Sequence, residues 1–215
     1  MATKANPMNI LLIEDNEHDR VAFQRAMKMG DVDCRIAFCK RAEEADDLMK
    51  SAGGAFDVVV LDFDLPGMNG LDFFKKMKRK KNLPPFVMLT GAGSEKLVVQ
   101  ALLAGMYDYV VKDAQMGYLN LLPVVLDTVL RRYADDRARR EAKAALKKAK
   151  DELEQKVRDI ALKNSIDADF TKVTEIEEIM KYGILMTPGL VVNEEVKSYG
   201  VIPKDEQIIN WLKGN

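Results

Sequence analysis

Short apolar runs alternate with amphipathic stretches over the first 130 residues of the chain. Runs rich in Val, Ile, Leu and Phe have the length of buried strands: Asn9–Ile13, Arg35–Cys39, Val58–Leu61, Phe86–Leu89 and Tyr109–Val111. Each is followed by a segment with helical periodicity: His18–Met29, Ala42–Ser51, Gly70–Lys80, Ser94–Ala104 and a last helix from Tyr118 onward. This alternation predicts an α/β fold in which helices cover both faces of a parallel sheet.

The last of these helices is predicted to continue far beyond the sheet. From Leu130 to about Lys163 the chain has no Gly or Pro and is dominated by strong helix formers. A short heptad seam follows a spacing of 4, 3, 4 and 7 along this stretch, at Ala142, Leu146, Ala149, Leu153 and Ile160. We expect a parallel two-helix coiled coil, and therefore a homodimer through the long helix. The alternative is a single charged helix that packs on its own chain.

After Asn164 the pattern changes to that of a small mixed fold. We expect a strand, a helix, a hairpin and a closing helix, at Asp169–Val173, Ile176–Tyr182, Leu190–Val192 with Val196–Tyr199, and Lys204–Leu212. The predicted domains are therefore residues 1–130, a helical linker at 131–163, and a module at 164–215.

Charge and cysteine content narrow the functional classes. The 33 Lys and Arg and 34 Asp and Glu leave a net charge of −1 in 215 residues, so there is no basic field for nucleic acid. No apolar run reaches the about 18 residues that a membrane span needs. The two cysteines, Cys34 and Cys39, match neither a redox motif nor a zinc site. We expect a soluble, cytoplasmic protein that binds neither nucleic acid nor membrane.

Side chains with complementary chemistry stand at the ends of the predicted strands. Glu14 and Asp15 follow the first strand, and Asp62, Thr90 and Lys112 follow the third, fourth and fifth. The carboxyl ends of parallel strands share one edge of the sheet, so these side chains are predicted to converge there. Clustered carboxylates repel one another and favour a hard cation, most plausibly Mg²⁺. Asp62 is then a candidate nucleophile that accepts a phosphoryl group.

Residues 8 to about 130 resemble the receiver domain of two-component response regulators. The resemblance rests on ILLIEDNEHDR, DVVVLDFDLPGMNGLDFF, VMLTGAGSE and AGMYDYVVKD. It implies a doubly wound, flavodoxin-like sheet of five strands in the order 2-1-3-4-5. It also implies a phosphoacceptor at Asp62, metal ligands at Glu14, Asp15, Asp62 and the backbone carbonyl of Asp64, phosphoryl contacts from Thr90 and Lys112, and an aromatic switch at Tyr109.

Two residues near this site bear on the resemblance. Asp113 stands where many receivers have a proline after the lysine, so the loop there is expected to differ. The Asp64 side chain adds a carboxylate two residues beyond the acceptor, and we expect it to alter the lifetime of the acyl phosphate.

The end of the chain resembles the later part of a small thioredoxin-like domain. The phrase IDADFTKVTEIEEIMKYGILMTPGLVVNEEVKSYGVIPKDEQIINWL carries the likeness, and Thr187-Pro188 matches the cis-proline of that family. The family's first strand and its C-x-x-C motif are missing, and a helix continuous with the receiver stands in their place. The gap is expected to be filled by a strand from a partner chain, by a rearranged Asp169–Val173, or by nothing.

The sequence therefore predicts a phosphorylation-dependent response regulator that is not itself an enzyme. Its partner would be a sensor histidine kinase or phosphotransfer protein, and its output protein contact and helix-mediated dimerisation. The alternative is a natural or engineered fusion in which the thioredoxin-like part is a structural assembly module. A redox enzyme is disfavoured because no cysteine follows Cys39.

Overall fold

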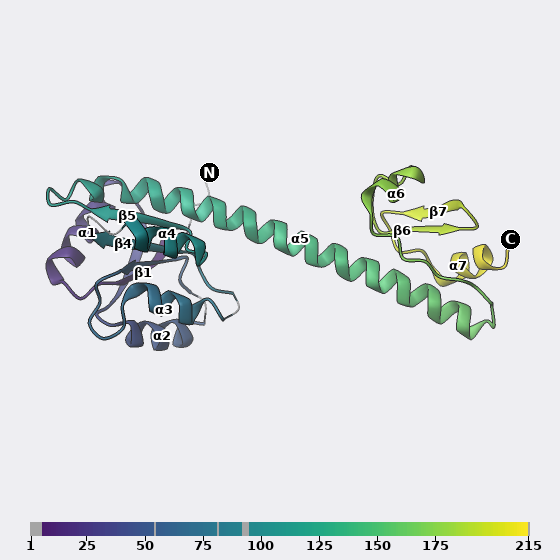
Figure 1. Ribbon diagram of the computed structural model, residues 1–215, viewed down its shortest axis with the longest axis horizontal. Coiled ribbons are helices and arrows are strands. Elements are labelled where there is room, and N and C mark those ends of the chain that lie inside the picture. The colour runs from purple at the N-terminus through teal and green to yellow at the C-terminus, as the bar shows by residue number, and fades with distance from the viewer. Residues whose placement is uncertain (1–5, 54, 81, 92–94, 215) are drawn as a thin grey trace. The chain divides into compact units, whose positions relative to one another are not determined.

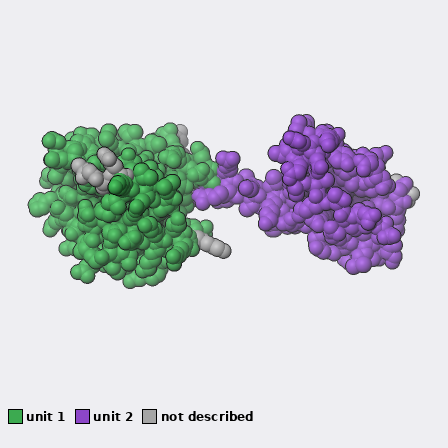
Figure 2. Space-filling model, in the orientation of Figure 1, with its two compact units in different colours: residues 1–136 green, residues 137–215 purple. Residues whose placement is uncertain are grey.

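A computed structural model shows two compact units, residues 1–136 and 137–215, coloured separately in Figure 2. The structure describes residues 6–53, 55–80, 82–91 and 95–214. Helix α5 (Leu122–Lys163) contributes residues to both units. It begins after a short 3₁₀ helix, η1 (Gly117–Asn120), and ends where the sequence predicted.

The first unit is built on a parallel sheet of five strands in the order β2-β1-β3-β4-β5, which confirms the predicted fold class. Its strands are β1 (Met8–Ile13), β2 (Cys34–Cys39), β3 (Val58–Asp62), β4 (Phe86–Gly91) and β5 (Asp108–Lys112). Every residue of β3 is buried, as expected for a central strand covered on both faces.

Helices close both faces of this sheet (Figure 1). The core on one face contains residues of α2 (Ala42–Ser51), α3 (Gly70–Met77) and α4 (Glu95–Leu103). The core on the other face contains residues of α1 (Glu17–Met29), η1 and the start of α5. The predicted start of the fourth helix, Ser94, lies outside the described residues.

The second unit packs a small α/β module against the end of α5. Its elements are α6 (Ile176–Lys181), the antiparallel hairpin β6 (Gly189–Val192) and β7 (Glu195–Tyr199), and α7 (Asp205–Leu212). Leu153, Val157 and Ile160 of α5 form the core of this unit with Ile208 of α7.

Residues 169–173 and the heptad seam of α5 differ from the sequence-based predictions in different ways. The predicted strand Asp169–Val173 is wrong, because that segment is extended but pairs with no described strand. The heptad seam is divided: Ala142 is exposed and Leu146 is 38% exposed, whereas Leu153 and Ile160 are each 5% exposed. The C-terminal part of the seam therefore packs on its own chain, as in the alternative reading, and coiled-coil pairing stays a prediction.

Among the described residues, no helix is long and apolar enough to cross a membrane.

The central strands carry much of the stability of the first unit. Leu12 of β1 is 1% exposed, and we predict that Leu12→Ala lowers the unfolding free energy of this unit by about 2–5 kcal/mol. Denaturant-dependent hydrogen exchange at β3 amides would measure the change in this unit alone. As a control, Leu103→Ala, at a residue 83% exposed, should change it by less than about 0.5 kcal/mol. Equal effects of the two substitutions would contradict the packing described here.

Candidate functional site

The carboxyl ends of the strands bring the predicted acids and the lysine together. Glu14 directly follows β1, Asp62 is the last residue of β3, and Lys112 is the last residue of β5. The Lys112 ammonium lies 2.7 Å from Glu14 Oε2 and 3.2 Å from Asp62 Oδ2. One cation therefore binds carboxylates from two neighbouring strands.

Asp19, which the sequence reasoning did not single out, completes the contacts of this lysine. Its Oδ2 lies 3.1 Å from Lys112 Nζ. Asp19 is in the first turn of α1, where acidic residues are common because they interact favourably with the helix dipole. Because of this ordinary explanation, the sequence alone offers no reason to expect Asp19 to contact Lys112. The contact follows from the fold, which places the first turn of α1 against the end of β5.

Glu14, Asp15 and Asp62 form an acidic triad. Each offers one carboxylate oxygen, and these oxygens lie within 4.8 Å of one another. Glu14 and Asp62 are buried, and Asp15 is exposed. The triad therefore has one side open to solvent.

Burial gives the triad unusual proton affinities. Desolvation raises the pKa of Glu14 to about 7, although the hydrogen bond from Lys112 opposes the shift. Desolvation also raises the pKa of Asp62, and the charge of Lys112 again opposes it. Burial alone would lower the pKa of Lys112, but the hydrogen bond to Glu14 and the charge of Asp62 are among the interactions that together raise it. The lysine is therefore fully charged at neutral pH.

The remaining predicted residues surround this cluster in different ways. Thr90 lies in β4, one residue before its end, and is completely buried. Asp64 is exposed in the loop after β3, and its backbone N–H donates to the Asp62 carboxylate. Tyr109 of β5 is half-buried and packs against the core under α2, α3 and α4.

Local interactions fix the loops that carry the acids. Arg20 donates to the backbone carbonyls of Glu14 and Asp15, at 3.0 and 2.9 Å, and so holds the β1–α1 loop. Gly70 starts α3 directly against the end of β3, where a Cβ would collide with the backbone oxygen of Asp62. A glycine is required there because the two backbones approach so closely.

Asp113, which stands where many receivers have a proline, organises the next loop. Its carboxylate accepts hydrogen bonds from the backbone N–H groups of Gln115, Gly117 and Tyr118, at 3.0, 3.0 and 2.8 Å. These bonds lower the pKa of Asp113 and shape the turn that leads into η1. Tyr118, which was predicted only as the start of a helix and not as a residue near the site, is buried there. Burial raises the pKa of its hydroxyl, and the charge of Asp19 raises it further.

The donor set fits a hard divalent cation. All three triad residues offer carboxylate oxygens, two of them buried, and Lys112 is shared with Asp19. Oxygen ligands with an open side are typical of Mg²⁺ sites, which keep several waters. The triad is thus of the kind found in receiver metal sites.

Comparison with protein families identifies the domains on either part of the chain, including the one that contains this site. The family model of the response regulator receiver domain matches residues 10–121, and that of the thioredoxin domain matches residues 147–213. The predicted Thr187-Pro188 peptide is cis in the structure.

Curated relatives match the first unit. Methanogenesis regulatory protein FilR1 of Methanothrix harundinacea is 29% identical over 128 residues, which are 59% of this chain and 28% of that protein. Two-component response regulator PhoP of Pseudomonas aeruginosa is 33% identical over 126 residues, which are 58% of this chain and 52% of PhoP. The chain therefore spans about half of the length of these relatives, or less.

Solved structures show the same fold. The signal receiver domain of an HD domain-containing protein from Pseudomonas fluorescens is 24% identical and covers 65% of this chain and 98% of its own, with a TM-score of 0.55. That of a putative Luxo repressor protein from Vibrio parahaemolyticus is 20% identical and covers 61% and 96%, with a TM-score of 0.54. The chain belongs to the response regulator receiver family, and a long helix joins its receiver domain to a thioredoxin-family domain.

Proposed function

We propose that the chain is a response regulator whose Asp62 accepts a phosphoryl group from a sensor histidine kinase or phosphotransfer protein. The observation that carries this proposal is the placement of Asp62 at the end of β3, beside Lys112 and the acids Glu14 and Asp15. The chain acts as the phosphoacceptor in this transfer and is not itself an enzyme.

The chain's own residues divide the work of the transfer. A carboxylate oxygen of Asp62 forms a bond to phosphorus while the bond from phosphorus to the donor's histidine nitrogen breaks, and that nitrogen regains a proton. Lys112 and the Thr90 hydroxyl bind phosphoryl oxygens in the product. Glu14, Asp15, Asp62 and the Asp64 carbonyl would hold Mg²⁺, which supplies positive charge against the incoming phosphoryl group.

The response is carried from β5 into α5. We propose that Tyr109 moves inward together with Thr90 when Asp62 is phosphorylated, which changes the surface formed by α4, β5 and α5. The last of these helices continues into the second unit, so a change of charge at Asp62 biases the contacts of the long helix.

Dimerisation through α5 belongs to the same proposal, but through a shorter part of the predicted heptad seam. Ala142 and Leu146 are exposed and available to a second helix, whereas Leu153 and Ile160 are buried in the core of the second unit with Ile208 of α7. Pairing is therefore proposed for the part of α5 before Ala149. The alternative, a fusion whose second unit serves assembly, draws support from the absence of any cysteine after Cys39.

Phosphorylation should require Asp62. We predict that acetyl phosphate with Mg²⁺ adds the mass of one phosphoryl group to the wild-type chain and none to Asp62→Ala, because Asp62 is the proposed acceptor, held between the Lys112 ammonium and the acids Glu14 and Asp15. Intact-mass spectrometry measures this directly. Asp72→Asn, at an exposed residue of α3, is the matched control and should be modified like wild type. Equal labelling of Asp62→Ala would reject the proposal.

Cation binding should depend on pH through Glu14. Because the pKa of its carboxyl is raised to about 7, the proton competes with the cation below that pH. We predict that saturating Mg²⁺ raises the melting temperature more at pH 8 than at pH 6. Calorimetry of Glu14→Gln should show a smaller Mg²⁺ effect with little pH dependence. A larger Mg²⁺ effect on wild type at pH 6 would contradict this account.

Asp19 should shorten the lifetime of the acyl phosphate. Its carboxylate competes for the Lys112 ammonium, which the phosphoryl group also needs. We predict that Asp19→Asn slows loss of the phosphoryl group about two- to fivefold, as expected for an interaction of about 1 kcal/mol or less. Asp47→Asn, on the exposed face of α2, is the control. Faster loss in Asp19→Asn would show that the residue supports the lysine instead of competing for it.

A further inference from the structure

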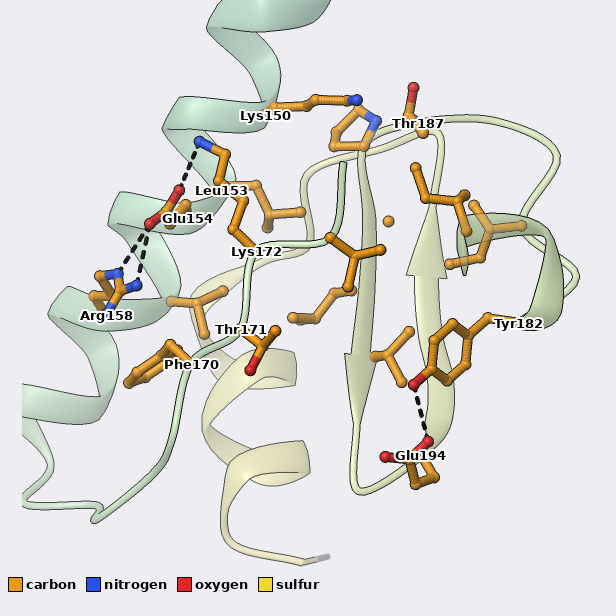
Figure 3. A pocket seen from close by; sticks show the side chains of 18 of the residues that line it. Lys150, Leu153, Glu154, Arg158, Phe170, Thr171, Lys172, Tyr182, Thr187 and Glu194 are labelled. Atoms are coloured by element: carbon orange, nitrogen blue, oxygen red, sulfur yellow. Dashed lines mark hydrogen bonds and ion pairs between the residues drawn. The ribbon is translucent and has the colours of Figure 1, made fainter. Parts of the chain in front are cut away.

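The second unit contains a cavity of its own. Its volume is about 590 Å³, and the residues that line it all belong to the second unit. Two extended stretches border it, the segment at residues 169–173 and the strand β6, as Figure 3 shows. The cavity is thus a slot between two backbones.

Both backbones have unused hydrogen-bonding groups along this slot. β6 pairs with β7 on one side only, and no backbone hydrogen bond joins its other edge to any described residue. Residues 169–173 make no backbone hydrogen bond within the described part of the chain. Unpaired edges of this kind are templates for an additional strand.

The walls of the slot suit a strand with apolar side chains. Leu153 and Val157 of α5, Ile179 of α6 and Ile184 after it contribute apolar surface. Three charged side chains on the walls form ion pairs: Glu154 pairs with Arg158 at 3.1 Å and with Lys172 at 2.8 Å, and Lys172 also pairs with Asp151 outside the slot at 2.9 Å. These three charges therefore compensate one another, while the Asp169 carboxylate, which also lines the slot, has no ion pair among the described residues.

The two ends of the slot differ in charge. Lys150 lies near Thr187 at one end, and Glu194, which accepts a hydrogen bond from the Tyr182 hydroxyl at 2.9 Å, lies at the other (Figure 3). Lys150 makes no ion pair with any described residue. A strand antiparallel to β6 would begin near Glu194 and end near Lys150, so a basic first residue and an acidic last residue complement the slot.

The described part of this chain has no spare strand to place there. Its extended runs are already used in the receiver sheet, the hairpin and residues 169–173. Among its described residues, a second copy could offer only the same two unpaired edges, which lack the apolar run with opposite charges at its ends that the slot complements. The apolar walls and the opposite charges at the two ends favour a segment of a different polypeptide as the occupant.

We propose that the slot between residues 169–173 and β6 binds an extended segment of another protein as an added strand, antiparallel to β6. The partner's segment is apolar in its middle, basic at its start and acidic at its end. This binding does not require phosphorylation at Asp62, since the slot is formed only by residues of the second unit.

A peptide of defined sequence tests the proposal on the full chain. The probe has about seven residues, with lysine first, glutamate last and β-branched apolar residues between. We expect one peptide to bind per chain and to protect the amides of residues 169–173 and 189–192 from hydrogen exchange. Methylating alternate backbone nitrogens of the peptide should weaken binding about tenfold or more, because backbone hydrogen bonds are lost.

Paired substitutions distinguish the slot from the rest of the surface. Thr171 is exposed and lines the slot, so Thr171→Trp should block it and weaken binding about tenfold or more. Thr174→Trp, at an exposed residue outside the slot, should leave binding within about twofold of wild type.

Several outcomes would overturn the proposal. Equal binding of the methylated peptide, absence of protection at both edges, or no measurable binding would each reject strand addition. Self-association of the chain with protection at the same two edges would reject a foreign partner in favour of a second copy. Wild-type and Asp62→Ala chains should bind the peptide equally, so a failure of the phosphoacceptor proposal leaves this test unaffected.

Discussion

The arrangement of the receiver site depends on one partly buried ammonium group. Lys112 reaches from β5 to Glu14 after β1, Asp19 in α1 and Asp62 at the end of β3, at 2.7, 3.1 and 3.2 Å. Two of these carboxylates are almost completely buried, and charges buried without a partner are strongly unfavourable. The lysine therefore joins the strand ends, and its positive charge reduces the repulsion between the carboxylates when no cation is bound. Three carboxylates face this single ammonium, and their remaining negative charge favours the binding of a cation.

This arrangement connects the acidic pocket to the long helix through a short path. Asp113, the neighbour of Lys112, fixes the turn before η1 by accepting three backbone N–H groups. Tyr118 of η1 is buried in the same core as the first turns of α5. The turn between Lys112 and α5 is thus held by hydrogen bonds to Asp113 and by the packing of Tyr118. The side chain of Asp113 shapes this turn at the position where many receivers have a proline.

The sheet and most of the pocket were predictable from sequence, because both follow from local pattern and strand topology. Buried runs such as Val58–Leu61 have few other places in a fold, and strand-end residues of a parallel sheet must share an edge. Asp19 was not predictable, since an acid in the first turn of a helix has an ordinary explanation. Asp169–Val173 was predicted as a strand from its local pattern, but a strand also needs a pairing partner, and this segment pairs with none of the described strands. The heptad spacing of α5 likewise did not reveal that Leu153 and Ile160 pack within their own chain.

The most direct test of the central role of Lys112 is the thermal stability of Lys112→Met with and without Mg²⁺. Methionine keeps the length and apolar character of the side chain but removes the charge. The account predicts that the receiver unit loses about 3 kcal/mol of stability without Mg²⁺, because Glu14 and Asp62 are left unpaired. It also predicts that Mg²⁺ restores a larger share of stability to the variant than it adds to wild type. An unchanged melting temperature in the absence of Mg²⁺ would contradict the account.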